Sequence, residues 1–493
     1  MQREIEDAEP WQRGTGLKPV RPAAIRAADS AERISTRRTD CKSVFLLTAA
    51  RIFLHALMLA LPVSRVAAAE AAPLPVSFRK DLAPLLQRRC AGCHGEENAK
   101  GGYRLDSFAK LRAPGDSGDA PVIAGKPRES VIFKVLIAID PDERMPQKAD
   151  PLPAAEIAMI ERWLGEGAVF DGGDAARPIA ELARETHLRP APPHYARPLP
   201  VTALAFNHDG QTLASSGYHE VLLWHAADGT LARRIGGLPE RIQSLAWNPK
   251  ADVLAVAGGT PGQWGTVALA DSAGRGAVQF LCDLTEVALG LAFSPDGKWL
   301  AAACGDKTIR VFEMPAGRLS RVLRNHSDWV QSVAFSPDGK SFVSASRDRS
   351  ARVFDVFKWE VQSTYRGFDV PLLAAVFSAD GSRIFATARG GIGHSWQPEK
   401  PDKHSDLTDF GGDVRQLAAG SFGVAAGCAD GSVRLYRADQ TAPYFTLRGH
   451  SSAVQSVAAA AKTGWIASGD AAGEVIVWSF DCATWLSRFT ATP

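Results

Sequence analysis

Residues 330–355, VQSVAFSPDGKSFVSASRDRSARVFD, decide the fold of most of this 493-residue chain. Short apolar runs that end in an aromatic residue alternate here with the turn sequence Ser-Pro-Asp-Gly, a pattern that predicts short strands joined by tight turns. The same run recurs seven times between residues 199 and 493, at spacings of 41, 46, 42, 42, 42 and 40 residues. Its ends align at Phe206, Trp247, Phe293, Phe335, Phe377, Ala419 and Ala459.

Each of the seven units predicts four short strands. A second column of large side chains follows the first, at Trp224, Phe312, Phe354, Trp396, Tyr436 and Trp478. Turn sequences recur between the two columns, at residues 207–210, 294–297, 336–339 and 379–381. A four-stranded sheet this small cannot bury both of its faces alone, so the units are expected to pack radially into a closed propeller.

The repeat resembles the WD40 family in its period and in two local features. Leu323–His326 and Leu447–His450 are similar to the Gly-His signal of that family, and Asp306, Asp348 and Asp430 stand in the tight turn before the third strand. The resemblance implies an all-β, seven-bladed WD40 propeller over residues 199–493, with these His and Asp side chains in a structural hydrogen-bonded network and protein partners as ligands. The lengthened second unit predicts an exposed loop at residues 258–265.

The residues that are expected to bind a cofactor lie in the segment from residue 72 to 172. Cys90-Ala91-Gly92-Cys93-His94 is a CxxCH motif, in which two thiols bind the vinyl groups of a haem and the adjacent His reaches the iron. A zinc site is the first alternative, but residues 70–186 contain no other Cys or His and tetrahedral zinc needs four ligands. A redox dithiol is the second, but an apolar helical stripe, Phe78 to Leu86, precedes the motif where a strand would be expected.

Methionine is the natural candidate for the sixth iron ligand, because the segment offers no second His. Met145 lies in a turn-like stretch, whereas Met159 lies inside a helix predicted over residues 153–165. The favoured axial pair is therefore His94 and Met145, with Met159, water or an open position as alternatives.

The order of motifs resembles the planctomycete-type cytochrome c domain. Besides the CxxCH and its following Gly95, the matching stretches are Gly101–Asp106, Gly125–Ser130, Arg144–Pro146 and the helix with Trp163. Gln147 departs from the family, which often has a second proline there. The resemblance implies a small all-α, class I-like cytochrome c domain with one covalent haem c, held by Cys90 and Cys93 and ligated by His94 and Met145.

Two further segments complete the predicted organisation. Basic residues, an apolar run at residues 52–62 and Ala67-Ala68-Ala69 predict a leader and signal peptide over residues 1–69, and cleavage is favoured over anchoring in a membrane. Five prolines predict a linker over residues 173–198, with a short helix near residues 179–185.

Charge and composition narrow the range of possible functions. The 56 Lys and Arg nearly balance the 54 Asp and Glu, so no basic body is available to hold nucleic acid. The favoured function is an exported, periplasmic electron carrier whose propeller docks a redox partner, and a catalyst is less favoured. The alternatives are a haem enzyme or small-ligand sensor with an open sixth position, and a WD40 interaction scaffold. No cluster of His, Glu or Asp in the propeller loops stands apart from the repeat pattern.

Overall fold

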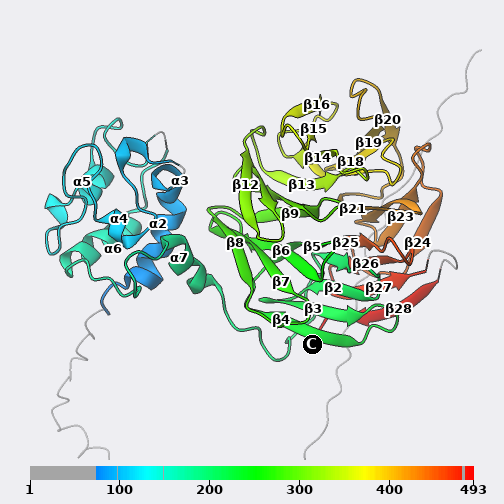
Figure 1. The fold of residues 1–493 in the computed structure, drawn as a ribbon, viewed down its shortest axis with the longest axis horizontal. Coiled ribbons are helices and arrows are strands. Elements are labelled where there is room, and N and C mark those ends of the chain that lie inside the picture. Colours follow the sequence, from blue (N-terminus) through cyan, green and yellow to red (C-terminus); the bar gives the residue numbers. More distant parts are fainter. Residues whose placement is uncertain (1–73, 97, 148, 480–483) are drawn as a thin grey trace, which may run out of the picture. The chain divides into compact units, whose positions relative to one another are not determined.

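The computed structural model describes residues 74–96, 98–147, 149–479 and 484–493. The predicted leader and signal peptide lie outside the described residues. Helices occupy the first part of the described chain and strands the remainder, following the blue-to-red colours of Figure 1. None of the helices in the described ranges has the length and apolar character that crossing a membrane requires.

Residues 78–187 form short helices around one apolar core. The helices are η1 (Phe78–Leu82), α2 (Ala83–Arg89), α3 (Ala91–His94), η2 (Lys100–Gly102), α4 (Phe108–Leu111), η3 (Pro127–Glu129), α5 (Val131–Ile137), α6 (Ala154–Gly165) and α7 (Ile179–His187). The helical stripe predicted over residues 78–86 is divided between η1, which has π geometry, and α2. Pro84 stands in the first turn of α2, directly after η1, whose last hydrogen bond runs from the Ala83 N–H to the Phe78 carbonyl.

Aromatic side chains organise the helical core. The rings of Phe78 and Phe108 meet edge to face at 5.0 Å, and Trp163 of α6 lies 5.6 Å from Phe78. The indole N–H of Trp163 donates to the Val169 carbonyl at 2.9 Å, so this buried side chain keeps its hydrogen bond. Helix α7 lies within the predicted linker, and it packs against α2 and buries Leu182 in the helical core.

Residues 204–490 form seven antiparallel sheets, each made of four consecutive strands. Blade 1 contains β1 (Leu204–Phe206), β2 (Thr212–Ser216), β3 (Glu220–His225) and β4 (Leu231–Gly236). Blade 2 contains β5 (Ile242–Trp247), β6 (Val253–Thr260), β7 (Trp264–Asp271) and β8 (Gln279–Leu284). Blade 3 contains β9 (Ala288–Phe293), β10 (Trp299–Cys304), β11 (Ile309–Glu313) and β12 (Arg318–Leu323). Blades 4 and 5 contain β13 (Val330–Phe335), β14 (Ser341–Ser346), β15 (Ala351–Asp355), β16 (Val361–Tyr365); β17 (Leu372–Phe377), β18 (Ile384–Ala388), β19 (Ile392–Trp396) and β20 (His404–Leu407). Blades 6 and 7 contain β21 (Val414–Gly420), β22 (Gly423–Cys428), β23 (Ser432–Tyr436), β24 (Phe445–Arg448); β25 (Val454–Ala459), β26 (Ile466–Asp470), β27 (Glu474–Trp478) and β28 (Trp485–Thr490). The predicted seven-bladed propeller is therefore confirmed.

The two columns of large side chains mark one layer of each blade. In blade 4, Phe335 of the first strand and Phe354 of the third both pair with Phe342 of the second. The rings of Phe342 and Phe354 stack at 4.6 Å, and both side chains are fully buried. The recurring residue is thus a packing layer between blades, and this is why its spacing in the sequence reports the fold.

The ring closes by contact between its first and last blades. The Val201 N–H donates to the Asp470 carbonyl at 3.0 Å, and the Ser456 hydroxyl donates to the Val201 carbonyl at 2.7 Å. The hydroxyl of Ser487, on the outer strand β28, donates to the carbonyl of Ala226 in the turn after β3, at 2.8 Å. Because each blade supplies its own four strands, these contacts and a shared apolar cluster close the ring without strand exchange.

The lengthened second unit corrects one prediction. Strands β6 and β7 continue their pairing as far as Thr260 and Trp264, so most of the insertion extends a hairpin instead of forming an exposed loop. Trp264 is buried, and only residues 261–263 make the turn. The glycine at position 259 allows this extension, since a Cβ on Gly259 would lie 2.3 Å from the Trp264 carbonyl oxygen.

A buried hydrogen-bonded network stabilises blade 4. His326 lies 2.8 Å from Asp348 through Nδ1 and 2.7 Å from the Ser344 hydroxyl through Nε2. Asp348 also accepts hydrogen bonds from the hydroxyl and backbone N–H of Ser350. Burial alone would raise the pKa of the Asp348 carboxyl, but the hydrogen bonds from His326 and Ser350 hold the pKa well below its usual range.

Asp348→Ala is expected to lower the free energy of unfolding by about 3 kcal/mol, because it leaves buried donors without an acceptor. Urea denaturation followed by circular dichroism would measure the loss. The pKa of Asp348 is lower in the folded state than in the unfolded chain, so its contribution is present above about pH 4 and declines as the pH falls below that value. The exposed Asp402→Ala is the control, and an equal loss in both variants would contradict the structural role.

Candidate functional site

The CxxCH motif spans the junction of α2 and α3. The Cys90 N–H donates to the Leu86 carbonyl at 2.9 Å, and the Cys90 carbonyl accepts from the His94 N–H at 3.0 Å. Cys90 and His94 are therefore one helical turn apart and share a face. Cys90 is half-buried and Cys93 is exposed, so the second thiol is accessible for covalent attachment. A Cβ on Gly95 would lie 2.7 Å from the Ala91 carbonyl oxygen, which explains the glycine after the motif.

The ring of His94 is oriented by a backbone carbonyl. His94 Nδ1 lies 3.3 Å from the carbonyl oxygen of Tyr103, whose ring meets the imidazole edge to face. The Tyr103 hydroxyl in turn donates to the Leu111 carbonyl at 2.9 Å. With Nδ1 held in this way, Nε2 is the nitrogen that remains for a metal. Sequence reasoning did not find Tyr103, because it acts through its main chain, which leaves no signature in residue type.

Three of the four predicted site residues line one cavity. It has a volume of about 280 Å³ and mostly apolar walls, and Cys90, His94 and Met145 all contribute to it. Cys93, the fourth predicted residue, lies at the exposed end of the motif. Met159 is not among the lining residues and packs, half-buried, against the hydrophobic core.

Of the two motif stretches between His94 and Met145, Gly101–Asp106 contributes to the cavity wall, and Gly125–Ser130 lies outside its lining. Gly102 has a left-handed backbone, and a Cβ there would lie 2.0 Å from a carboxylate oxygen of Asp116. The neighbouring Gly101 carbonyl accepts from the Asp116 N–H at 2.9 Å, which brings residues 115–119 to the rim. Near the other motif, the buried Ser130 hydroxyl accepts from the Ile123 N–H at 2.9 Å and closes the turn before α5.

Met145 is fixed in the wall by its main chain. Its N–H donates to the carbonyl of Val135 in α5 at 2.8 Å, and both residues line the cavity. The side chain is half-buried against the core. A thioether on this turn therefore shares the cavity with the imidazole of His94, as a His and Met ligand pair requires.

The environment of Cys90 disfavours a redox dithiol, and the lack of further ligands disfavours zinc. Burial, reinforced by the nearby Glu156 carboxylate, raises the pKa of the Cys90 thiol to about 12. A redox dithiol needs a thiolate, which this environment opposes. Among the described residues, the clusters of three or more metal-binding side chains do not include Cys90, Cys93 or His94. A neutral thiol beside an apolar cavity and an oriented imidazole are compatible with covalent haem.

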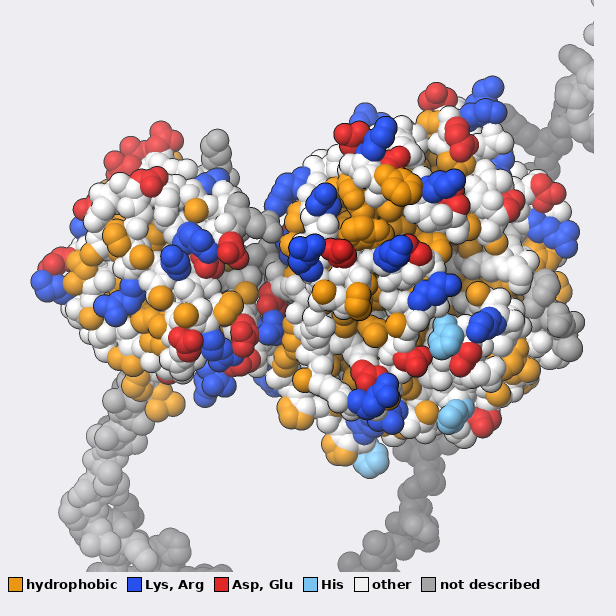
Figure 2. Space-filling view, viewed as in Figure 1, with side chains coloured by type: hydrophobic (Ala, Val, Ile, Leu, Met, Phe, Trp, Pro, Cys, Tyr) orange, Lys and Arg blue, Asp and Glu red, His pale blue; other side chains and the backbone are white. Residues whose placement is uncertain are grey.

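The propeller contains a central cavity of about 620 Å³, lined mainly by the first strand of each blade. Its polar lining side chains are mostly serines and glutamines, and Arg415 is the one charged residue among the described residues that line it. No His or carboxylate of the described chain contributes to this lining, so the cavity offers no acid–base pair. On the face shown in Figure 2, basic and acidic side chains are interspersed.

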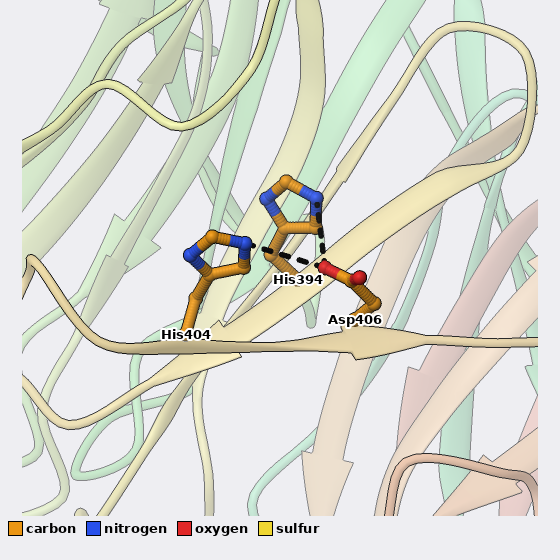
Figure 3. Close-up of side chains that lie close together, drawn as sticks. All are labelled: His394, His404 and Asp406. Atoms are coloured by element: carbon orange, nitrogen blue, oxygen red, sulfur yellow. Dashed lines mark ion pairs between the residues drawn. The ribbon is translucent and has the colours of Figure 1, made fainter.

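Two clusters of His and carboxylate side chains lie elsewhere in the propeller. His450, Asp470 and Glu474 belong to the buried network of blade 7, in which the Ser468 hydroxyl lies 2.7 Å from His450 Nε2. The other cluster, His394, His404 and Asp406, is drawn in Figure 3. It stands apart from the repeat pattern and lies on strands β19 and β20, so the sequence prediction, which concerned the loops, did not cover it.

Comparison with known families gives two matches. Residues 90–148 match the family described as Planctomycete cytochrome C. Residues 192–225, 285–313, 317–355 and 441–479 match the WD domain, G-beta repeat. No curated protein matches the chain significantly. The chain therefore joins a planctomycete cytochrome C segment to WD40 repeats that fold as a seven-bladed β-propeller.

Proposed function

We propose that this protein is an exported c-type cytochrome that transfers single electrons. Residues 72–172 are its class I-like haem domain, Cys90 and Cys93 attach one haem c, and His94 and Met145 are the axial ligands. The observation that carries the proposal is the convergence of Cys90, His94 and Met145 on one apolar cavity. Bound haem supplies an iron that alternates between two oxidation states.

The residues of the chain determine how that iron is used. The Tyr103 carbonyl keeps His94 Nδ1 occupied and leaves Nε2 for coordination. Met145 would supply the second protein ligand, and this would leave small molecules no vacant site on the iron. A methionine ligand and apolar walls both favour the reduced state and so give a higher reduction potential than two histidines would.

The propeller serves in this proposal as the docking platform for a redox partner protein. WD40 propellers generally mediate protein–protein interaction, and no His or carboxylate of the described residues lines the central cavity. The N-terminal segment directs export, which places the protein in the periplasm, and attachment to the membrane follows only where that segment is retained.

A visible spectrum of the exported protein, with haem staining of a denaturing gel, tests the proposed function. We expect a stained band, a low-spin spectrum in both oxidation states, and the weak red absorption of a sulfur-ligated oxidised iron. A stained band with a high-spin spectrum would favour the enzyme or sensor, for which the polar side chains of Lys100 and Asp116 on the cavity wall are available. Absence of haem would leave a WD40 interaction scaffold.

A further inference from the structure

Blade 5 lacks the hydrogen-bonded network of blade 4. His326, Ser344 and Asp348 form that network, and the residues 42 positions later are Phe368, Ala386 and Gly390. None of these three replacements has a side chain that can hydrogen-bond. One consequence is that the buried indole N–H of Trp396, in the second aligned column, has no hydrogen-bond partner within the described structure.

Blade 5 has three side chains that can bind a metal at positions where the corresponding side chains of blade 4 are not typical metal ligands. Arg352, Gln362 and Thr364 of blade 4 are followed, 42 positions later, by His394, His404 and Asp406. Blade 5 therefore lost a structural network and gained two imidazoles and a carboxylate.

The strand register brings the three new side chains together. His394 on β19 pairs directly with Asp406 on β20, and His404 lies two residues before Asp406. Residues two apart on a strand point to the same face, and directly paired residues share that face. Figure 3 shows both rings turned toward the carboxylate.

The distances suit a shared ion better than direct hydrogen bonds. Nε2 of His394 lies 3.6 Å from Asp406 Oδ1, and Nε2 of His404 lies 3.3 Å from the same oxygen. Both separations exceed the usual 2.7–3.2 Å of an N–H···O hydrogen bond. A tetrahedral ion with bonds of about 2.0–2.2 Å holds its ligand atoms about 3.3–3.6 Å apart.

The surroundings fix the imidazole of His394 for this purpose. Its Nδ1 lies 2.5 Å from the Tyr365 hydroxyl on β16 of the neighbouring blade, so Nε2 is the nitrogen that faces Asp406. The ring stacks on Phe368 at 4.1 Å and on His404 at 4.5 Å. Outer polar partners and packing of this kind hold metal-binding histidines in orientation.

We propose that His394, His404 and Asp406 bind a divalent transition-metal ion, with Zn²⁺ as the representative ion. Two imidazoles and one carboxylate form a ligand set typical of zinc sites that keep an open fourth position. Asp406 is 77% exposed, which leaves the fourth position to water. The ion joins β19 to the outer strand β20. The site is independent of the haem proposal.

Isothermal titration of the full-length protein with ZnCl2, after removal of bound metal by chelation, tests the site. We expect one zinc ion in the wild type. His404→Ala and Asp406→Ala each remove a ligand and are expected to weaken zinc binding by at least about tenfold, and Tyr365→Phe by about tenfold. Asp406 is 77% exposed and His404 is 37% exposed, so neither side chain belongs to the buried core, and circular dichroism would verify that both variants fold.

Two controls distinguish this site from others. His208→Ala removes a surface imidazole that lies 3.6 Å from Asp252, and it should bind zinc as the wild type does. Cys90→Ser with Cys93→Ser should also retain the zinc. Binding that survives in both His404→Ala and Asp406→Ala but disappears in the cysteine variant would place the ion at the thiols and overturn the proposal. Absence of zinc binding by the wild type would overturn it too.

Discussion

Cys90→Ser combined with Cys93→Ser is expected to abolish covalent haem while the propeller stays folded. Serine hydroxyls do not form the thioether bonds by which both cysteines would hold the haem vinyl groups. The propeller should be unaffected, because its blades have their own apolar clusters. Haem staining of a denaturing gel and the mass of the intact chain would measure attachment, and the β signal in circular dichroism would measure the fold.

The matched control for this prediction is Cys304→Ser. Cys304 is fully buried on β10 in blade 3, and its thiol lies 3.6 Å from the Ala302 carbonyl oxygen. Removal of this thiol should leave haem staining at the wild-type level. Staining that persists in the Cys90 and Cys93 double variant, or that disappears in Cys304→Ser, would show that the CxxCH motif does not carry the cofactor.

The propeller could be predicted from the sequence because every blade repeats the same packing arrangement. Phe335, Phe342 and Phe354 form a layer between blades, and such residues must recur once per blade for the ring to close. Because this pattern of large side chains is repeated seven times, it can still be recognised where an individual residue is replaced. Blade 2 shows this, since Ala270 pairs with Leu254 where other blades have an aromatic residue.

The candidate haem site was predictable in its residues but not in its supports. The CxxCH spacing identifies Cys90, Cys93 and His94, and Met145 is identified because the segment offers few other ligands for the iron. The Tyr103 carbonyl that orients His94 could not be predicted, because any residue offers a carbonyl and only the folded chain determines which one is near.

The cluster in blade 5 illustrates a different limit. His404 and Asp406 form a short His-x-Asp sequence, but His394 joins them only through the register of β19 with β20. The three side chains lie on strands, outside the loops to which the sequence prediction applied. The clue available in the sequence was the loss of the network residues at Phe368, Ala386 and Gly390, which becomes visible once blades 4 and 5 are aligned at 42 residues.

Met145→Ala is expected to leave haem attached but to open the sixth position of the iron. Alanine cannot ligate iron, and the truncation enlarges a cavity that Met145 now lines. The low-spin spectrum should become high-spin, the reduced protein should bind carbon monoxide, and the reduction potential should fall because the methionine that favours the reduced state is gone. Visible spectroscopy with a carbon monoxide titration would measure the change.

Met159→Ala is the matched control, because both methionines are half-buried against the same helical core and only Met145 lines the cavity. Each truncation removes a similar amount of apolar contact, so a general loosening of the core would affect the two variants alike. Carbon monoxide binding confined to Met145→Ala therefore isolates ligation from packing. A low-spin, carbon monoxide-insensitive Met145→Ala would show that another side chain ligates the iron, and Lys100 is a candidate on the cavity wall.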